Sequence, residues 1–305
     1  SCGRGRGDVV RGVGSDIGLR SDTNQAEGAT EGIVDTFDSD GFTVDVDSTV
    51  GYHTNESGTT YAAWNWKAGG TAVSNTAGSI TSQVSANTDA GFSIVSYTGN
   101  GTAGATVGHG LSSVPDMIIV KIRSGFSGGT NWRVYHSALG ATQNLRLNTD
   151  DAAVSETNKW NDTAPTSSVF SLGNHVSVNE NNATAIAYCF ANTDGYLKAG
   201  SYTGNGSSDG PFVHTGFRPA WVLIKYTSGS QDWTLFDSKR EGFNETDKYL
   251  HPSASAAEGD YDTLEVDLLS NGFKCRGPYN HINASGGTYI YLAFAENPFK
   301  YANAR

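Results

Sequence analysis

A glycine-rich turn is the first feature of the sequence that could do chemistry. Residues 99–104, Gly-Asn-Gly-Thr-Ala-Gly, match the GxGxxG spacing of a dinucleotide-binding turn. Such a turn lies between a strand and a helix, whereas residues 105–110, Ala-Thr-Val-Gly-His-Gly, are poor helix formers. Residues 204–210 begin with the same Gly-Asn-Gly and then lose the spacing. The motif therefore predicts a hairpin turn, and we expect no cofactor.

Two acidic clusters could bind a cation. Their members are Asp35, Asp38, Asp40, Asp45 and Asp47, and then Asp260, Asp262, Glu265 and Asp267. Asp38-x-Asp40-Gly41 matches a fragment of a calcium-binding loop, but the other ligand positions and the closing glutamate are missing. Asp45 and Asp47 alternate with valines, as on the solvated face of a strand. We predict solvated turns and strand faces, with a weak cation site as the alternative.

Catalytic patterns are missing from the rest of the sequence. The seven histidines form no HxH or HExxH pair, and there is no GxSxG motif around a serine. The three cysteines cannot all pair, and none lies in a CxxC arrangement. Cys189 aligns with Ala293 and Asn65 of the other copies, and Cys275 aligns with Leu172. Positions that mostly hold small or apolar residues predict packed, unreactive thiols. We expect no catalytic residues, no metal centre and a protein that is not an enzyme.

Composition places these motifs in an acidic, glycine-rich protein. Glycine accounts for 38 of the 305 residues, well above a usual share of about 7%. The net charge of −11 disfavours nucleic acid as a partner, because phosphates would be repelled. No apolar run approaches the roughly 20 residues that span a bilayer, so we expect no membrane insertion. Since Met117 is the only methionine, we expect a processed chain or a piece of a longer one.

Internal repetition is the strongest signal in the sequence. Ser-Tyr-Thr-Gly-Asn-Gly occurs at residues 96–101 and again at 201–206, and the segment 179–191 recurs at 283–295. Two full copies follow, residues 86–190 and 191–305, the second with a short C-terminal tail. Residues 1–67 form a partial copy with the second half only, in which Asp8 and Arg11 fall near Asp237 and Arg240. This alignment favours a structural role for Asp8 over a cell-adhesion role for the tripeptide Arg6-Gly7-Asp8.

Each copy has the pattern of a β-sandwich. Short branched apolar runs lie between turns such as Gly-Asn-Gly and Asp-Gly, which supply the positive φ of hairpins. The closing segment alternates, and its large residues share one parity in every copy: Ala62, Trp64 and Trp66; Ile186, Tyr188 and Phe190; Ile290, Leu292 and Phe294. This parity predicts the core-facing side. The fold class expected is all-β, with tandem antiparallel β-sandwich (jelly-roll-like) repeats of about 100 residues.

Residues 68–85 belong to no copy. They are mostly Gly, Ser, Thr, Ala and Asn, which is typical of a linker. Ile80, Ser82 and Val84 would share one face of an extended edge strand, and both alternatives stay open.

The repeated motifs resemble those of a known family. Residues 91–102, 160–170 and 287–295 are similar to segments of an uncharacterised repeat-domain family of virion structural and tail-fibre proteins from tailed phages, mostly marine ones. The resemblance covers nearly the whole chain from about residue 8. It implies a virion setting and carries no catalytic residues.

Loops that differ between the copies are the candidate contact sites. They are residues 124–130, 175–182 and 276–282, and they contain Phe126, His175, Tyr279 and His281. Aromatic residues on loops are common contacts for sugars or proteins. The alternative is that they cover the end of their own sandwich.

We expect a non-enzymatic virion protein, an appendage or a surface component acting in assembly or host attachment. Its expected partners are further copies of the chain, in a trimer, other virion proteins and a host surface glycan. The oligomer is expected because Trp64 and Trp66 have no partner strands within their own copy, which would leave an apolar face bare. The alternatives are a carbohydrate-binding module and a polysaccharide-degrading tailspike.

Overall fold

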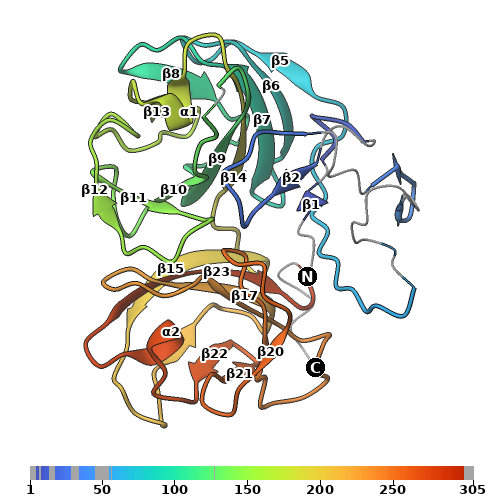
Figure 1. The fold of residues 1–305 in the computed structure, drawn as a ribbon, viewed down its shortest axis with the longest axis vertical. Coiled ribbons are helices and arrows are strands. Elements are labelled where there is room, and N and C mark those ends of the chain that lie inside the picture. Colours follow the sequence, from blue (N-terminus) through green and yellow to red (C-terminus); the bar gives the residue numbers. More distant parts are fainter. Residues whose placement is uncertain are drawn as a thin grey trace.

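The computed structural model describes residues 5–6, 8–13, 18–28, 34–44, 55, 57–126 and 128–298. They form two stacked β-sandwich units, with N-terminal segments beside the upper one (Figure 1). The sheets are antiparallel, so the all-β sandwich expected from the sequence is confirmed. Among these residues, no helix has the length and apolar character to span a membrane.

The upper unit is built on an eight-stranded sheet with the order β12-β11-β10-β9-β14-β7-β6-β5, and a β13–β8 pair lies across its core. Its elements are β5 (Val73–Asn75), β6 (Ser82–Asn87), β7 (Phe92–Thr98), β8 (Ala105–Gly108), β9 (Met117–Ser124), β10 (Arg133–His136), β11 (Gln143–Arg146), β12 (Val154–Ser155), β13 (Val169–Leu172), α1 (Val176–Asn179) and β14 (Thr184–Phe190).

The lower unit packs a four-stranded sheet, β15-β23-β17-β18, against a three-stranded sheet, β16-β22-β21. Its elements are β15 (Leu197–Thr203), β16 (Phe212–His214), β17 (Pro219–Tyr226), β18 (Thr234–Asp237), β19 (Lys248–Tyr249), β20 (Gly259–Asp260), β21 (Val266–Leu269), β22 (Gly272–Cys275), α2 (Asn280–Asn283) and β23 (Thr288–Ala295). The N-terminal segments add the pairs β1 (Gly5–Arg6) with β2 (Leu19–Arg20), and β3 (Thr36–Phe37) with β4 (Phe42–Thr43).

Corresponding strands occupy the same places in both units. β14 lies between β7 and β9, and β23 lies between β15 and β17. The turn that follows β7 and the turn that follows β15 are held in the same way. Asn179 Oδ1 accepts from the backbone N–H of Asn100 at 2.9 Å, and Asn283 Oδ1 accepts from that of Asn205 at 2.8 Å. We refer to the two units below as repeat two and repeat three.

The turn with GxGxxG spacing is not the hairpin that the sequence predicts: it connects two sheets, because β7 pairs with β6 and β14 whereas β8 pairs with β13. Gly101 and Gly104 have φ values of 68° and 79°, a backbone region that favours glycine, and the chain continues into β8. The turn therefore has a structural role, which is to connect β7 with β8.

One boundary and one strand expected from the sequence differ from the structure. The expected start of repeat two at residue 86 falls inside β6, which pairs with β7 over residues 82–87. The edge-strand alternative for residues 68–85 therefore holds for their C-terminal part, and β5 adds a second edge strand. The strand expected around residues 62–66 is not formed, since the structure assigns no strand between residues 57 and 72.

The main sheets bury both of their faces. The small residues of β14, such as Ala187 and Cys189, lie in the core of repeat two. The large residues of β14 and β23, such as Phe190 and Phe294, lie together in one core between the two units. The parity of large residues thus identified a buried face, but that face packs against the neighbouring repeat instead of within its own sandwich.

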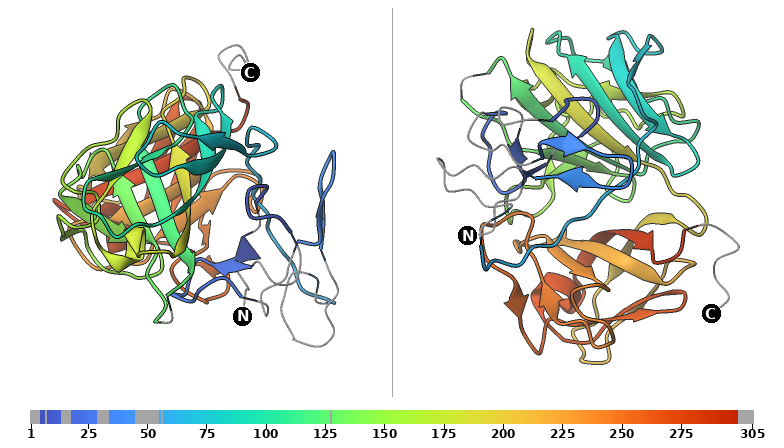
Figure 2. Two further views of the ribbon diagram at one scale, coloured as in Figure 1. Left: turned by 90° about the horizontal axis from the view of Figure 1, so that it is seen from above. Right: turned by 90° about the vertical axis from the view of Figure 1, so that its right-hand side faces the viewer.

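Trp64 and Trp66 lie against this shared core. The ring centroid of Trp66 is 5.5 Å from that of Trp221 and 5.4 Å from that of Phe294. The chain around these residues runs along the junction of the two units (Figure 2, right, light blue). The premise of a bare tryptophan face was therefore wrong, because both side chains are half-buried within their own chain.

Candidate functional site

A buried lysine in each repeat holds a segment from the preceding part of the chain. In repeat two, Lys121 Nζ donates to the carbonyl oxygens of Asn24, at 2.9 Å, and Thr130, at 2.5 Å. In repeat three, Lys225 Nζ donates to the carbonyl oxygen of Asp150 at 2.8 Å and to that of Gln231. Burial lowers the pKa of both lysines to about 8.

A buried tryptophan beside each lysine makes a second contact of the same kind. Trp132 Nε1 donates to the carbonyl of Arg20 at 2.9 Å, and Trp233 Nε1 donates to that of Arg146 at 2.8 Å. The acceptors lie four residues before Asn24 in one case and four before Asp150 in the other. We call residues 20–27 and 146–153 the locking segments, because each fastens one repeat to the next through equivalent backbone atoms.

An ion-pair network marks the partial N-terminal copy. Arg11 Nε lies 2.5 Å from Asp8 Oδ2, and Arg11 Nη1 lies 2.8 Å from Glu27 Oε1. Repeat three contains the same network, in which Arg240 pairs with Asp237 at 2.6 Å and with Glu258 at 2.9 Å. The sequence alignment of Arg11 with Arg240 therefore corresponds to a shared structure.

The carboxylate of Asp8 is buried and already satisfied. Besides Arg11, it accepts from the hydroxyl of Tyr188 at 2.8 Å and from the backbone N–H of Val10. A receptor could not reach this group without unfolding the segment. The structure therefore favours the structural role over the adhesion role of the tripeptide.

Two of the four candidate contact residues have a structural role within their own repeat. Phe126 is half-buried against the core of repeat two. His175 precedes α1, and its Nδ1 accepts from the backbone N–H of Ser177 at 3.1 Å, so it caps the helix.

The other two candidates, Tyr279 and His281, belong to one row of rings on repeat three. They stack on each other at 5.0 Å with an angle of 15° between the planes. Tyr261 continues the row at one end, and His251 and then Tyr249 continue it at the other, with ring centroids 4.9–5.6 Å apart. Tyr261 is 53% exposed and Tyr279 is 38% exposed, so this end of the row is open to solvent.

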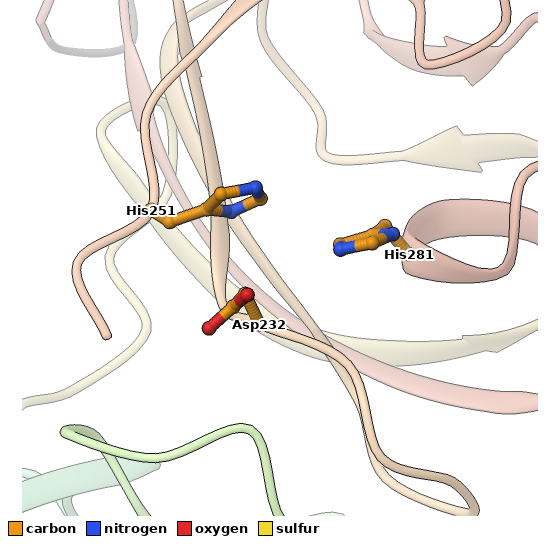
Figure 3. Close-up of side chains that lie close together, drawn as sticks. All are labelled: Asp232, His251 and His281. Carbon is orange, nitrogen blue, oxygen red and sulfur yellow. The ribbon is translucent and has the colours of Figure 1, made fainter. Parts of the chain in front are cut away.

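Asp232 joins the histidines of this row. One ligand atom each from Asp232, His251 and His281 lies within 4.8 Å of the others, and the three come from different segments (Figure 3). Sequence analysis missed Asp232 and His251, because 19 and 30 residues separate the three positions and no motif links them. The available signal was the comparison of copies, since repeat two has Asn131, Arg146 and Ser177 at these places.

Residues 4–298 match a family described as a domain of unknown function, DUF7483. The chain belongs to this family. The match includes the segment with Asp8 and Arg11 as well as both repeats, so one family domain comprises all three parts. Searches of curated proteins and of solved structures gave no match.

Asp38 and Asp267 of the acidic clusters are satisfied within the chain, whereas Asp260 and Asp262 lie with Asp247 in a group whose carboxylates could hold a cation, so the alternative of a weak cation site stays open there. Asp38 accepts from the hydroxyls of Thr36 and Thr43, both at 3.0 Å, within the β3–β4 turn. Asp267 pairs with Arg276 at 2.5 Å. Asp45 and Asp47 lie outside the described residues. Both buried thiols, Cys189 and Cys275, have pKa values that burial raises to about 12, so they remain protonated at neutral pH.

Carboxylates repel one another near β20. Burial, followed by the neighbouring Glu245 and Asp247, raises the pKa of Glu265 to about 7. Burial and Glu241 raise that of Asp247 to about 6. At pH values between the ordinary carboxyl pKa and these raised pKa values, the folded state binds more protons than the unfolded state. Stability from this cluster therefore falls as the pH rises from about 4 to 7.

Glu265→Gln is expected to stabilise the protein at pH 8 by about 0.5–1 kcal/mol, the range for largely solvated charges. At pH 5 the effect should be much smaller, because the carboxyl group of the folded state is then largely protonated. Thermal unfolding at both pH values measures this. Glu258→Gln is the matched control and should destabilise, since it removes the partner of Arg240. A stabilisation by Glu265→Gln that is equal at pH 5 and pH 8 would contradict the assignment.

Proposed function

We propose that this chain is a non-enzymatic structural component of a tailed-phage virion, in an appendage or on the particle surface, acting in assembly or host attachment. The observation that supports it best is the pair of locking segments, which join successive repeats through the same carbonyl contacts to Lys121 and Lys225. Modules joined in series through equivalent interfaces suit an extended structural part. The virion setting follows from the resemblance of the repeated motifs.

The proposal includes other virion proteins and further copies of the chain as partners, with a trimer favoured. The bare-face argument for the oligomer no longer supports it, because Trp66 packs on Trp221 and Phe294 in its own chain. Light scattering of the purified chain at micromolar concentration should give a trimer. A monomer at that concentration would remove the oligomer from the proposal and leave the structural role untouched.

Mass spectrometry of purified particles tests the virion location. Peptides from both repeats should co-purify with particles through a density gradient and remain after a salt wash. Antibody against the purified chain should label the intact particle, which would also show the position of the chain on it. Peptides that occur only in the infected-cell lysate, and never with particles, would overturn the proposal.

Glycan binding is a second candidate, favoured by the row of rings on repeat three. The open end of the row, Tyr261 and Tyr279, offers two neighbouring ring faces to a ligand. Exposed aromatic faces bind sugars through their apolar surface. A glycan array should then show binding that Tyr279→Ala abolishes and that Phe243→Ala, a change at an exposed ring outside the row, preserves. Release of reducing ends from a bound glycan would favour the polysaccharide-degrading tailspike instead.

A further inference from the structure

We propose that Asp232, His251 and His281 form a binding site for a divalent transition-metal ion of the zinc type. Two imidazole nitrogens and one carboxylate are a common ligand set for such ions, which leaves further positions for water. Figure 3 shows His281 extending from α2 toward the other two side chains. Metal–ligand bonds of about 2.0–2.2 Å separate tetrahedral ligands by roughly 3.3 Å. Ligand atoms that already lie within 4.8 Å of one another need only small side-chain movements to reach this spacing.

Hydrogen bonds at the back of two ligands orient them for this role. His251 Nδ1 lies 2.9 Å from the carbonyl oxygen of Trp233, which can only accept, so Nδ1 carries the proton and the lone pair is on Nε2. The Oδ1 atom of Asp232 accepts from the hydroxyl of Ser253 at 2.7 Å. Supporting hydrogen bonds of this kind, from histidine to a carbonyl and to a ligating carboxylate, are the usual second layer of metal sites.

His281 is held by ring stacking. It lies between Tyr279 and His251, at 5.0 Å and 5.2 Å between ring centroids. Its Nδ1 is buried without a hydrogen-bond partner among the described residues. An imidazole nitrogen of this kind can act as a metal ligand.

Repeat two supplies an internal comparison, because it places a cationic side chain at the same location. There Arg133 Nε donates to Ser177 Oγ at 2.9 Å, and Ser177 is the counterpart of His281. In repeat three the counterpart of Arg133 is Thr234, which cannot reach that position. Repeat three has an aspartate and two histidines where repeat two has Asn131, Arg146 and Ser177, and it also lacks the guanidinium of Arg133. A metal cation would supply a positive charge at this place.

The site would fasten the segment after β19 to α2 and to the residues that precede β18. His251 begins residues 251–258, the counterpart in repeat three of the locking segment that starts at Arg146. Zinc binding is therefore expected to order the segment that begins at His251 in repeat three.

The test is zinc binding to the chelator-treated protein, which equilibrium dialysis and metal analysis measure. We expect one zinc ion per chain at micromolar concentration, and no competition from Mg²⁺ or Ca²⁺, which prefer oxygen ligands. Asp232→Asn and His281→Ser, the latter using the residue of repeat two, should each lower the affinity at least tenfold. His214→Ser, at an exposed histidine on β16, is the matched control and should bind zinc as the unchanged protein does.

A measurement without variants guards against misfolding. In imidazole nitrogen NMR of the unchanged protein, one equivalent of zinc should shift the resonances of two histidines and leave the other five in place. Failure to bind zinc at a one-to-one ratio would overturn the proposal. Equal loss in His214→Ser, or shifts spread over all seven histidines, would show adventitious binding and overturn it as well.

Discussion

Replacing Phe294 by alanine is expected to lower the free energy of unfolding by about 3–5 kcal/mol, the range for truncating a buried aromatic side chain. Phe294 is 5% exposed and lies in the core between the two units. Its ring contacts Trp66, Phe190 and Trp221, which come from three parts of the chain. The substitution therefore leaves a cavity that both repeats line, and both should unfold at lower denaturant concentration.

Urea unfolding followed by tryptophan fluorescence measures this effect. Phe243→Ala is the matched control, because Phe243 is 81% exposed and its removal should stay within about 0.5 kcal/mol of the unchanged protein. A loss below about 1 kcal/mol for Phe294→Ala, well short of the range for buried aromatics, would mean that the shared core is not formed.

Replacing Arg11 by methionine is expected to lower the free energy of unfolding of the N-terminal segments by about 3–5 kcal/mol, as for a buried ion pair that loses one partner. The side chain of Arg11 is fully buried, and the change leaves Asp8 and Glu27 without its charge. Residues 18–28 should then be held less firmly on repeat two, where the ion pair of Glu27 with Arg123 and the backbone bond between these two residues remain.

Arg240→Met is the matched comparison within the same chain. It removes the equivalent network, but Glu258 is largely solvated, so the loss should be smaller. Hydrogen exchange over residues 18–28 should rise in Arg11→Met and stay unchanged in Arg240→Met. Equal effects of the two substitutions on those residues would contradict the docking of the partial copy described above.

The sequence predicted the fold class because local patterns determine it. Turn glycines such as Gly101, and the alternation along residues 184–190, encode the ends and the faces of the strands directly. The same alternation could not show that Phe190 and Phe294 meet in one core, because which sheet faces which is decided by packing between distant segments. The strand expected at Trp64 and Trp66 failed for the same reason: these residues use their large side chains to cover the junction instead of pairing in a sheet.

The site was predicted in part. Tyr279 and His281 were selected because their loop differs between copies, and they do lie together on repeat three. Asp232 and His251 were not, because nothing local brings residues 19 and 30 positions apart into one cluster. Phe126 and His175 were selected by the same rule but pack against and cap their own repeat, since variable loops also carry variable structural residues.

Hydrogen exchange of the tryptophan indole protons, observed by nitrogen NMR, tests the interlocking of the repeats most directly. The chain has six tryptophans, and two of them, Trp132 and Trp233, donate from Nε1 to locking segments. Their indole protons should be among the slowest to exchange, with similar protection, while that of the half-buried Trp64 exchanges quickly. Exchange at Trp132 as fast as at Trp64, with Trp233 still protected, would show that residues 20–27 do not lock onto repeat two.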